Sequence, residues 1–192
     1  NSTDTGEAVE IAGPAGTDLT GWSVELYNGN NSESYGSISL SGTIPDEGSG
    51  YGTLSFSRAG IQNGAPDGMA LVDSTSTVIQ FLSYEGSFTA LDGPAAGMAS
   101  TDIGVAETST TPAGHSLQLV GTGTMYEEFA WQNPAADSFG SINAGQTFGT
   151  GSGAGGTTGE VTQVEFFYRH SEDGLDWGNW TSIGTDTDGS DG

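Results

Sequence analysis

The chain has no cysteine and no lysine, and its only basic side chains are Arg58 and Arg169. Without cysteine it cannot form disulfides, thiolate nucleophiles or cysteine-ligated zinc sites. Nucleic-acid binding depends largely on Lys and Arg contacts with phosphates, and here two arginines stand against 25 carboxylates. We therefore expect no direct nucleic-acid binding.

Long hydrophobic runs are also missing. No run approaches the roughly 20 apolar residues of a membrane-spanning helix, and an anionic membrane would repel a chain of formal net charge −23. We expect no membrane insertion. A charge of this size attracts cations and keeps proteins soluble, while self-repulsion weakens the compact state. It predicts stability that rises with salt or with calcium.

What the sequence does contain is a series of short segments with period-two alternation of apolar residues. They lie at 9–11, 22–26, 54–56 and 117–119, and residues 69–72 and 78–84 predict a hairpin. The second arm of that hairpin is apolar on both faces, as in a central strand covered on two sides. Glycine, proline and asparagine separate the segments at close intervals. The pattern predicts an all-β chain, either a sandwich or a barrel.

The composition changes at residues 149–159, where Gly, Ser, Thr and Ala alone form a stretch typical of a flexible linker. Beyond it, Val164, Phe166 and Tyr168 alternate with Glu165, Phe167 and Arg169. An acidic turn then leads to a second segment, which carries Trp177 and Trp180. A lone hairpin is marginally stable. We expect residues 160–192 to be the opening hairpin of a truncated immunoglobulin-like β-module, although docking on the first domain is an alternative.

Several blocks in a fixed order carry a family resemblance. They read GEAVEI at 6–11, DLTGWS at 18–23, GTIP at 42–45, GAPDGMALVD at 64–73, VIQFLSYEG at 78–86, STDIGV at 100–105, SLQL at 116–119, Trp131 and FGSIN at 139–143. Residues 6–148 thereby resemble a lamin tail domain, of the bacterial secreted type found beside extracellular nucleases. Matched blocks in order are more specific than any single motif.

The resemblance implies an immunoglobulin-like β-sandwich for residues 1–148. Members of this family normally begin with an apolar strand ahead of the segment that matches 6–11, and here only five residues precede it. We therefore expect the sandwich to lack its first strand, and the chain to be a segment of a longer protein. A missing strand leaves an edge that invites pairing with another chain. Contacts with DNA, known in nuclear relatives, do not carry over to a chain with so few cations.

The acidic tail offers a candidate metal site. Asp186, Asp188, Ser190 and Asp191 place oxygen ligands at near-alternating positions, as calcium loops do. The tail lacks the distal bidentate glutamate and the sixth-position glycine of an EF-hand, so a solvated acidic turn is the alternative reading. The acidic turn formed by Glu172, Asp173 and Asp176 is a weaker candidate. Calcium is the only cofactor that the sequence suggests.

No catalytic residues are predicted. His115 and His170 are the only imidazoles, and His115 and Ser116, as strand neighbours, point to opposite faces. Acidic pairs such as Glu7 with Glu10, or Glu127 with Glu128, are expected at the surface. Trp22 and Trp131 are expected to pack between sheets, whereas Tyr126 and Trp180 are the better candidates for a sugar-stacking surface.

These observations predict a non-catalytic accessory or attachment module of a secreted or cell-surface multidomain protein. Its partners would be neighbouring domains of the same polypeptide, or protein or polysaccharide at a cell surface. The loops at 45–50, 63–68 and 92–97 would be presented by the rigid sandwich. Two alternatives remain open: an accessory segment of an extracellular nuclease or other hydrolase whose catalytic domain lies elsewhere, and a calcium-dependent adhesin or structural surface protein.

Overall fold

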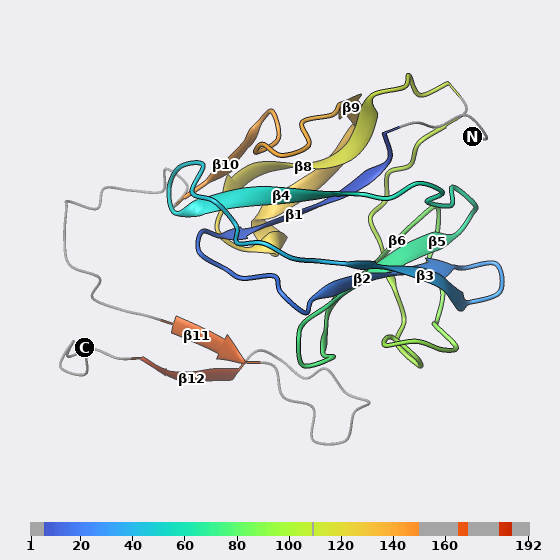
Figure 1. Ribbon diagram of the computed structural model, residues 1–192, viewed down its shortest axis with the longest axis horizontal. Helices are drawn as coiled ribbons and strands as arrows, with labels where there is room; N and C mark the ends of the chain where they lie inside the picture. The colour runs from blue at the N-terminus through green and yellow to red at the C-terminus, as the bar shows by residue number, and fades with distance from the viewer. Residues whose placement is uncertain (1–5, 109, 150–164, 169–180, 186–192) are drawn as a thin grey trace. The chain divides into compact units, whose positions relative to one another are not determined.

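The computed structural model describes residues 6–108, 110–149, 165–168 and 181–185 (Figure 1). Within these ranges the chain is built from β-strands, with one turn of 3-10 helix and no α-helix. In chain order the elements are β1 Ala8–Pro14, β2 Ser23–Asn28, β3 Glu33–Ser39, β4 Tyr51–Ser57, β5 Asp67–Val72, β6 Val78–Tyr84, β7 Thr101–Asp102, β8 His115–Gly123, η1 Tyr126–Glu128, β9 Phe129–Ala136, β10 Gln146–Phe148, β11 Glu165–Tyr168 and β12 Thr181–Thr185. The predicted all-β class is confirmed.

The largest sheet has five strands in the order β3-β2-β5-β6-β7. Its first four strands pair antiparallel, and the two-residue β7 pairs parallel with the end of β6. The predicted hairpin is β5 and β6, joined by a turn in which Asp73 accepts two backbone N–H groups. β6 is not fully covered on both sides as its sequence suggested, because Ile79 is 53% exposed.

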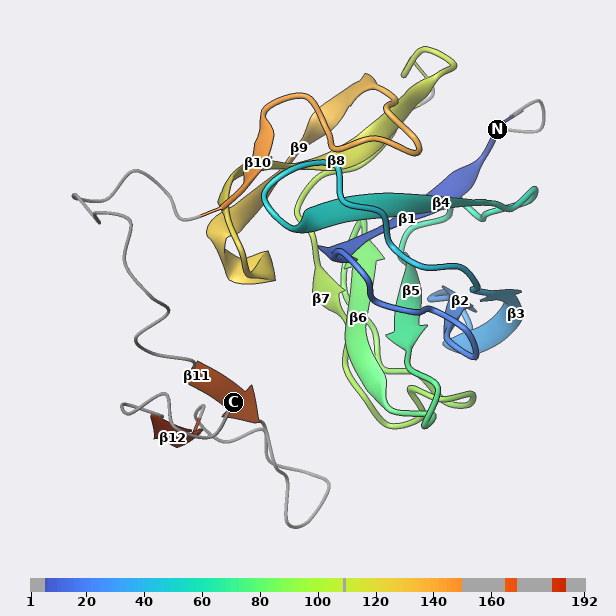
Figure 2. The same cartoon turned by 60° about the vertical axis from the view of Figure 1, so that its left-hand side comes forward.

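Two smaller sheets complete the first unit of the chain. β1 and β4 form an antiparallel ribbon, and β10-β8-β9 form a three-stranded sheet in which β10 runs parallel to β8. In both ribbon views the β1–β4 ribbon lies between the five-stranded and the three-stranded sheet (Figures 1 and 2). This stacking of sheets without barrel closure is the layering of a β-sandwich.

The main core lies between the five-stranded sheet and the β1–β4 ribbon. Its fully buried residues come from β2, β3 and the loops beside them, namely Leu19, Val24, Leu26, Ile38, Leu40 and Ile44. Val9 and Ile11 of β1 and Leu54 and Phe56 of β4 pack against this cluster but are only partly buried. The period-two pattern of β1 and β4 therefore marks the core face correctly, as strand geometry requires.

A second core covers the other part of the large sheet. Tyr27 is completely buried and its ring packs against Phe81 and Phe88, with ring centroids 5.1 and 6.4 Å away. Its hydroxyl donates a hydrogen bond to the carbonyl of Asp92 at 3.2 Å and accepts one from the N–H of Ala95 at 3.0 Å. Tyr27 thus helps to hold the segment that follows β6 over the sheet, together with the bonds from Leu91 N–H to the carbonyl of Ser32 and from Ser34 N–H to Asp92.

The chain divides into two compact units, residues 1–151 and 152–192. In the second unit β11 and β12 pair antiparallel with a register shift. The predicted linker at 149–159 lies outside the described residues apart from Gly149. The boundaries of the predicted domains therefore stay predictions.

Candidate functional site

Two glutamates fasten the three-stranded sheet to the ribbon beneath it. Glu10 in β1 accepts the N–H of Gly140 at 2.6 Å, and Glu47 accepts the N–H of Ile142 at 2.9 Å. The other oxygen of Glu47 accepts both the N–H and the hydroxyl of Thr53, at 2.7 and 2.8 Å. The loop between β9 and β10 is therefore held by carboxylates that lie more than 90 residues away in sequence.

The environments of these two glutamates push their pKa values in opposite directions. Burial raises the pKa of Glu10, the N–H of Gly140 opposes the increase, and the charge of Glu47 adds to it. Burial also acts to raise the pKa of Glu47, but hydrogen bonds from Thr53 and Ile142 outweigh it, so that pKa is lowered. Two carboxyls with separated pKa values are a known arrangement for acid and base roles. Here both oxygens of Glu47 are already occupied by the protein itself.

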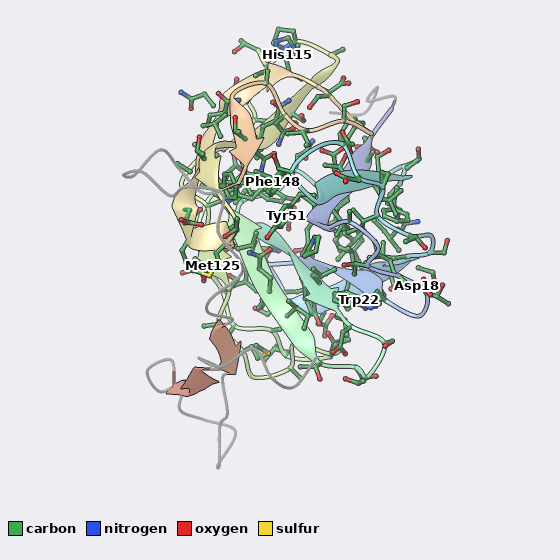
Figure 3. The ribbon with its side chains drawn as sticks, turned by 90° about the vertical axis from the view of Figure 1, so that its left-hand side faces the viewer. Asp18, Trp22, Tyr51, His115, Met125 and Phe148 are labelled. Carbon is green, nitrogen blue, oxygen red and sulfur yellow. The ribbon has the colours of Figure 1, made fainter. Side chains whose placement is uncertain are left out.

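An aromatic cluster supports the same junction. Tyr51 at the start of β4 stacks on Phe148 of β10 with centroids 4.9 Å apart and planes 4° from parallel (Figure 3). Phe129 of β9 meets Phe148 edge-on at 5.2 Å. Phe148 is the one fully buried apolar residue of the three-stranded sheet among the described strands. The junction is thus apolar at one end and carboxylate-linked at the other.

Other carboxylates accept backbone N–H groups within turns. Asp18, Asp46, Asp73 and Asp102 each bind the N–H of the residue two positions ahead. Glu128 accepts the N–H groups of Thr124 and Met125 at 2.7 and 3.0 Å, and these bonds lower its pKa. Such turns explain why so many acids are compatible with a folded chain, since charge-assisted bonds to N–H groups are strong.

Among the described residues, Asp67 is the most deeply buried carboxylate, with 1% of its surface exposed. Its two oxygens accept the N–H groups of Gly29 and Gly64, at 3.1 and 2.6 Å. Burial raises the pKa of Asp67, and these two N–H groups oppose the increase. The residue joins the end of β2 to the loop that precedes β5, which is a structural role.

A polar network surrounds Gln62 in the same loop. Its N–H donates to the hydroxyl of Tyr35 at 2.9 Å, its carbonyl accepts the hydroxyl of Tyr84, and its side-chain oxygen accepts Asn28 Nδ2 at 2.6 Å. Burial raises the pKa of Tyr35 and of Tyr84. Both phenols therefore stay protonated at neutral pH and serve as hydrogen-bonding anchors.

Arg58 follows β4 and leans on the edge strand of the large sheet. A Cβ added to Gly36 of β3 would lie 2.8 Å from Arg58 Nη2, so glycine at this position makes room for the guanidinium. Arg58 Nε is buried without a hydrogen-bond partner. Sequence analysis assigned no role to Arg58. Gly36, the residue that makes room for it, lies 22 positions away in sequence, so this packing is visible only in the folded chain.

Of the residues that sequence analysis considered for catalysis, Glu10 was expected at the surface and is instead half-buried, because the β9–β10 loop covers its carboxylate. His115 begins β8 and has a buried Nδ1 without a partner, while Ser116 Oγ accepts Gln118 Nε2 at 3.0 Å. Figure 3 places His115 at the opposite end of the three-stranded sheet from Met125. Tyr126, predicted as a surface platform, is half-buried and its hydroxyl accepts Trp131 Nε1 at 2.9 Å.

The remaining sequence candidates lie outside the described residues. These are Asp186, Asp188, Ser190 and Asp191 of the proposed calcium site, the acidic turn of Glu172, Asp173 and Asp176, and also His170 and Trp180. In the part of the chain that is described, no group of three or more His, Cys, Asp or Glu side chains could hold a metal ion. The calcium site therefore stays a prediction.

The three loops expected to be presented are largely exposed, but two of them also place residues in the core. Asp67 and Gly68, within the predicted loop 63–68, are buried residues of β5. In the loop 92–97, Ala95 is completely buried beside Tyr27. Only the loop 45–50 is exposed throughout, and even there Glu47 holds Thr53. These are internal roles that loop composition alone did not reveal.

No described helix has the length and apolar character to cross a bilayer. Comparison of the chain with protein-family models, with curated proteins and with solved structures gives no match. The lamin tail resemblance therefore rests on the ordered sequence blocks alone.

Proposed function

We propose that the chain is a non-catalytic attachment module of a secreted or cell-surface multidomain protein, built on an immunoglobulin-like sandwich of the lamin tail type. The observation that carries this proposal is that the buried or junction carboxyl groups bind backbone N–H groups of the protein itself, and so are structural. Glu10, Glu47 and Asp67 are the acids with perturbed pKa values in the packed interior or at the sheet junction, and each accepts N–H groups of the chain's own loops. Groups used in this way build a rigid frame.

The positions of the resembling blocks support the lamin tail assignment. The block at 6–11 leads into β1 and forms its first four residues, the block at 64–73 contains all of β5, and the block at 78–86 contains all of β6. The block at 42–45 contributes Ile44 to the main core. Most apolar positions of the blocks, with Ile79 as an exception, thus coincide with packed positions of a layered β-structure, as expected if the resemblance reflects a common fold.

The attachment role can be tested with a fluorescent protein fused to the full chain. Applied to intact cells of the organism that produces it, the fusion should remain after washing. An equally acidic disordered tail on the same reporter is the matched control, because it shares the charge and lacks the sandwich. Protease-treated cells and periodate-treated cells then separate protein from polysaccharide partners. A fusion that washes off as readily as the acidic tail contradicts the proposal.

An activity assay tests the non-catalytic part separately. The isolated chain, incubated with DNA or a phosphate monoester in magnesium and calcium, should give no turnover above buffer. Turnover that increases in proportion to the amount of chain, and persists through repurification, would contradict it.

A further inference from the structure

The hydrogen-bond pattern of the β1–β4 ribbon identifies the backbone groups that point away from it. The carbonyl of Glu7 accepts the N–H of Arg58 at 2.9 Å, and the N–H of Ala15 donates to the carbonyl of Gly50 at 2.8 Å. Antiparallel pairs alternate between bonded and non-bonded positions. With the register Ala8↔Ser57 through Pro14↔Tyr51, the odd-numbered residues of β1 bond to β4. Ala8, Glu10 and Ala12 therefore direct their N–H and C=O groups outward.

These outward groups are unpaired within the part of the chain that the structure describes. β1 has β4 as its single strand partner, and no backbone or side-chain bond reaches the N–H or C=O of Ala8, Glu10 or Ala12. Ala12 is exposed to solvent. We call the three residues the β1 edge. Unpaired backbone groups in a row are a template for another strand.

The large sheet protects its corresponding edge. On β3 the N–H of Ser34 donates to Asp92 Oδ1 at 2.7 Å. The opposite edge strand, β7, has only two residues. A further strand would have to displace the Asp92 carboxylate from β3, or would find too little backbone to pair with on β7.

Most of the other edges of the small sheets are also blocked. The free edge of β4 is covered by Glu47 of the preceding loop. The N–H of Glu47 donates to the carbonyl of Tyr51 at 2.8 Å, and its carboxylate accepts the N–H of Thr53 at 2.7 Å. β9 carries Pro134, a residue that cannot donate to a ladder, and β10 has only three residues. The β1 edge carries no such protection; among the described strands, β8 also lacks a strand partner over residues 115–120, on the side where β10 pairs only with residues 121–123.

Apolar packing beside the β1 edge is incomplete. The fully buried apolar residues of the first unit include none from β1, β4, β8 or β9. Val9 and Ile11 face the main core yet remain partly exposed. A strand added along β1 would cover their open side and complete the layer with apolar side chains on the same face.

We propose that the β1 edge binds an extended segment of a partner polypeptide, in which apolar residues on the core face alternate with Lys or Arg on the outer face. The chain has a net charge of −23, so a basic strand is electrostatically complementary to it. A second copy is disfavoured, because it would join two chains of the same high charge. This inference names a partner class for the attachment function and in that sense rests on it.

The test uses the full chain and a synthetic peptide as long as β1, seven residues, in which Lys alternates with Val and Ile. Its matched control carries backbone N-methyl groups at alternate residues, which keeps the charge and removes the hydrogen bonds. Fluorescence anisotropy at physiological salt should give binding about tenfold weaker for the methylated peptide, since several ladder bonds are lost. Amide hydrogen exchange should slow at Ala8, Glu10 and Ala12.

Two protein variants locate the site. Ala12→Lys adds a positive charge at the β1 edge and should weaken peptide binding by about tenfold. Ser37→Lys makes the same charge change at an exposed position of β3 and should leave binding unchanged. The thermal unfolding of both variants should match that of the parent chain, because both positions are exposed.

Several results would overturn the proposal. Equal affinity for the two peptides would reduce the binding to non-specific charge attraction, and equal weakening by the two variants would place it elsewhere. A dimer of the chain alone, with the β1 edge amides protected, would identify a second copy as the occupant. If the peptide fails to bind while the fusion still adheres to cells, this inference is wrong and the attachment function stands.

Discussion

The N–H of Gly140 lies 2.6 Å from Oε2 of Glu10, although 130 residues separate the two in sequence. The neighbouring bond from Ile142 to Glu47 makes this a double fastening of one loop. The three-stranded sheet is held to the ribbon at this point by carboxylates and backbone, without a basic side chain. The contribution of each carboxylate can be measured separately because their pKa values are shifted in opposite directions.

Replacing Glu10 tests whether its charge or its acceptor oxygen matters. The raised pKa means that the folded protein binds the proton more tightly than the unfolded one, so ionised Glu10 costs stability once the pH exceeds the folded pKa. Glu10→Gln keeps an acceptor and should leave the free energy of unfolding within about 0.5 kcal/mol of the parent value. Glu10→Ala should lower it by about 1–3 kcal/mol. Urea unfolding at neutral pH measures both, and equal losses would refute the distinction.

Asp67 should respond differently to the same kind of change. Both of its oxygens accept N–H groups, from Gly29 and Gly64, so an amide at this position presents NH2 to one donor. Asp67→Asn should therefore lower the free energy of unfolding by about 1–3 kcal/mol, in contrast to Glu10→Gln. Chemical denaturation of the two variants side by side is the measurement. An Asp67→Asn variant as stable as the parent would show that one bond is dispensable.

The facing glycines of the ribbon, Gly13 and Gly52, form a matched pair. A Cβ on Gly52 would lie 2.0 Å from the carbonyl oxygen of Pro45, whereas one on Gly13 would meet only Ile44 Cδ1 at 3.2 Å. Gly52→Ala should cost about 2–3 kcal/mol because backbone must move. Gly13→Ala should cost less than about 1 kcal/mol, since a side chain can adjust. Thermal unfolding of the two variants compares them, and the opposite order would contradict this packing.

High pH should unfold the chain through its buried tyrosines. Burial raises the pKa of Tyr27, Tyr35 and Tyr84 in the folded protein. Their stabilising contribution is complete below the unfolded tyrosine pKa, near 10, and is lost as the pH rises above it toward the folded values. Tyrosinate absorbance should then increase together with unfolding measured by circular dichroism. Ionisation of all six tyrosines before any unfolding would contradict the prediction.

Tyr27→Phe and Tyr51→Phe give a matched comparison at neutral pH. The first variant leaves the buried N–H of Ala95 without its acceptor and should cost about 1–3 kcal/mol. The second keeps the ring that stacks on Phe148 and should cost less than about 0.5 kcal/mol. Comparable losses in denaturant titrations would argue against a special role for the Tyr27 hydroxyl.

Salt should raise the melting temperature. A chain of net charge −23 repels itself, and screening shortens the range of that repulsion to about 3 Å at molar ionic strength. Differential scanning calorimetry from low to molar sodium chloride should give a steady increase, and calcium should act at lower concentration. Sucrose at matched osmolality controls for general solvent effects. A flat profile in both salts would exclude self-repulsion as a determinant of stability.

The local parts of this structure could be predicted from the sequence. Alternation located β1, β2, β4 and β8, and the apolar segments at 69–72 and 78–84 located β5 and β6. β3 was missed because serine and glycine fill most of it and only Ile38 is fully buried. The short β10 depends on pairing with β8, a contact between residues far apart in sequence.

The roles of the carboxylates also fall into two classes, those that could be predicted from the sequence and those that depend on the fold. An aspartate that binds the N–H two residues ahead, as Asp73 binds Thr75, follows from turn chemistry that is visible in the sequence. Glu10 and Glu47 are different, because their donors belong to a loop that only the folded chain brings near. Sequence spacing contains no information on such a distance.

The turn aspartates also change how the acidity of this chain is understood. Asp18, Asp46, Asp73 and Asp102 contribute to the electrostatic field of the surface and at the same time hold the shape of the turns beneath it. Replacing these aspartates with neutral residues would remove the hydrogen bonds that hold the turns, and would therefore destabilise the turns as well as reduce the charge. Only acids without such bonds could be exchanged freely, so the anionic character of this protein is anchored in its architecture.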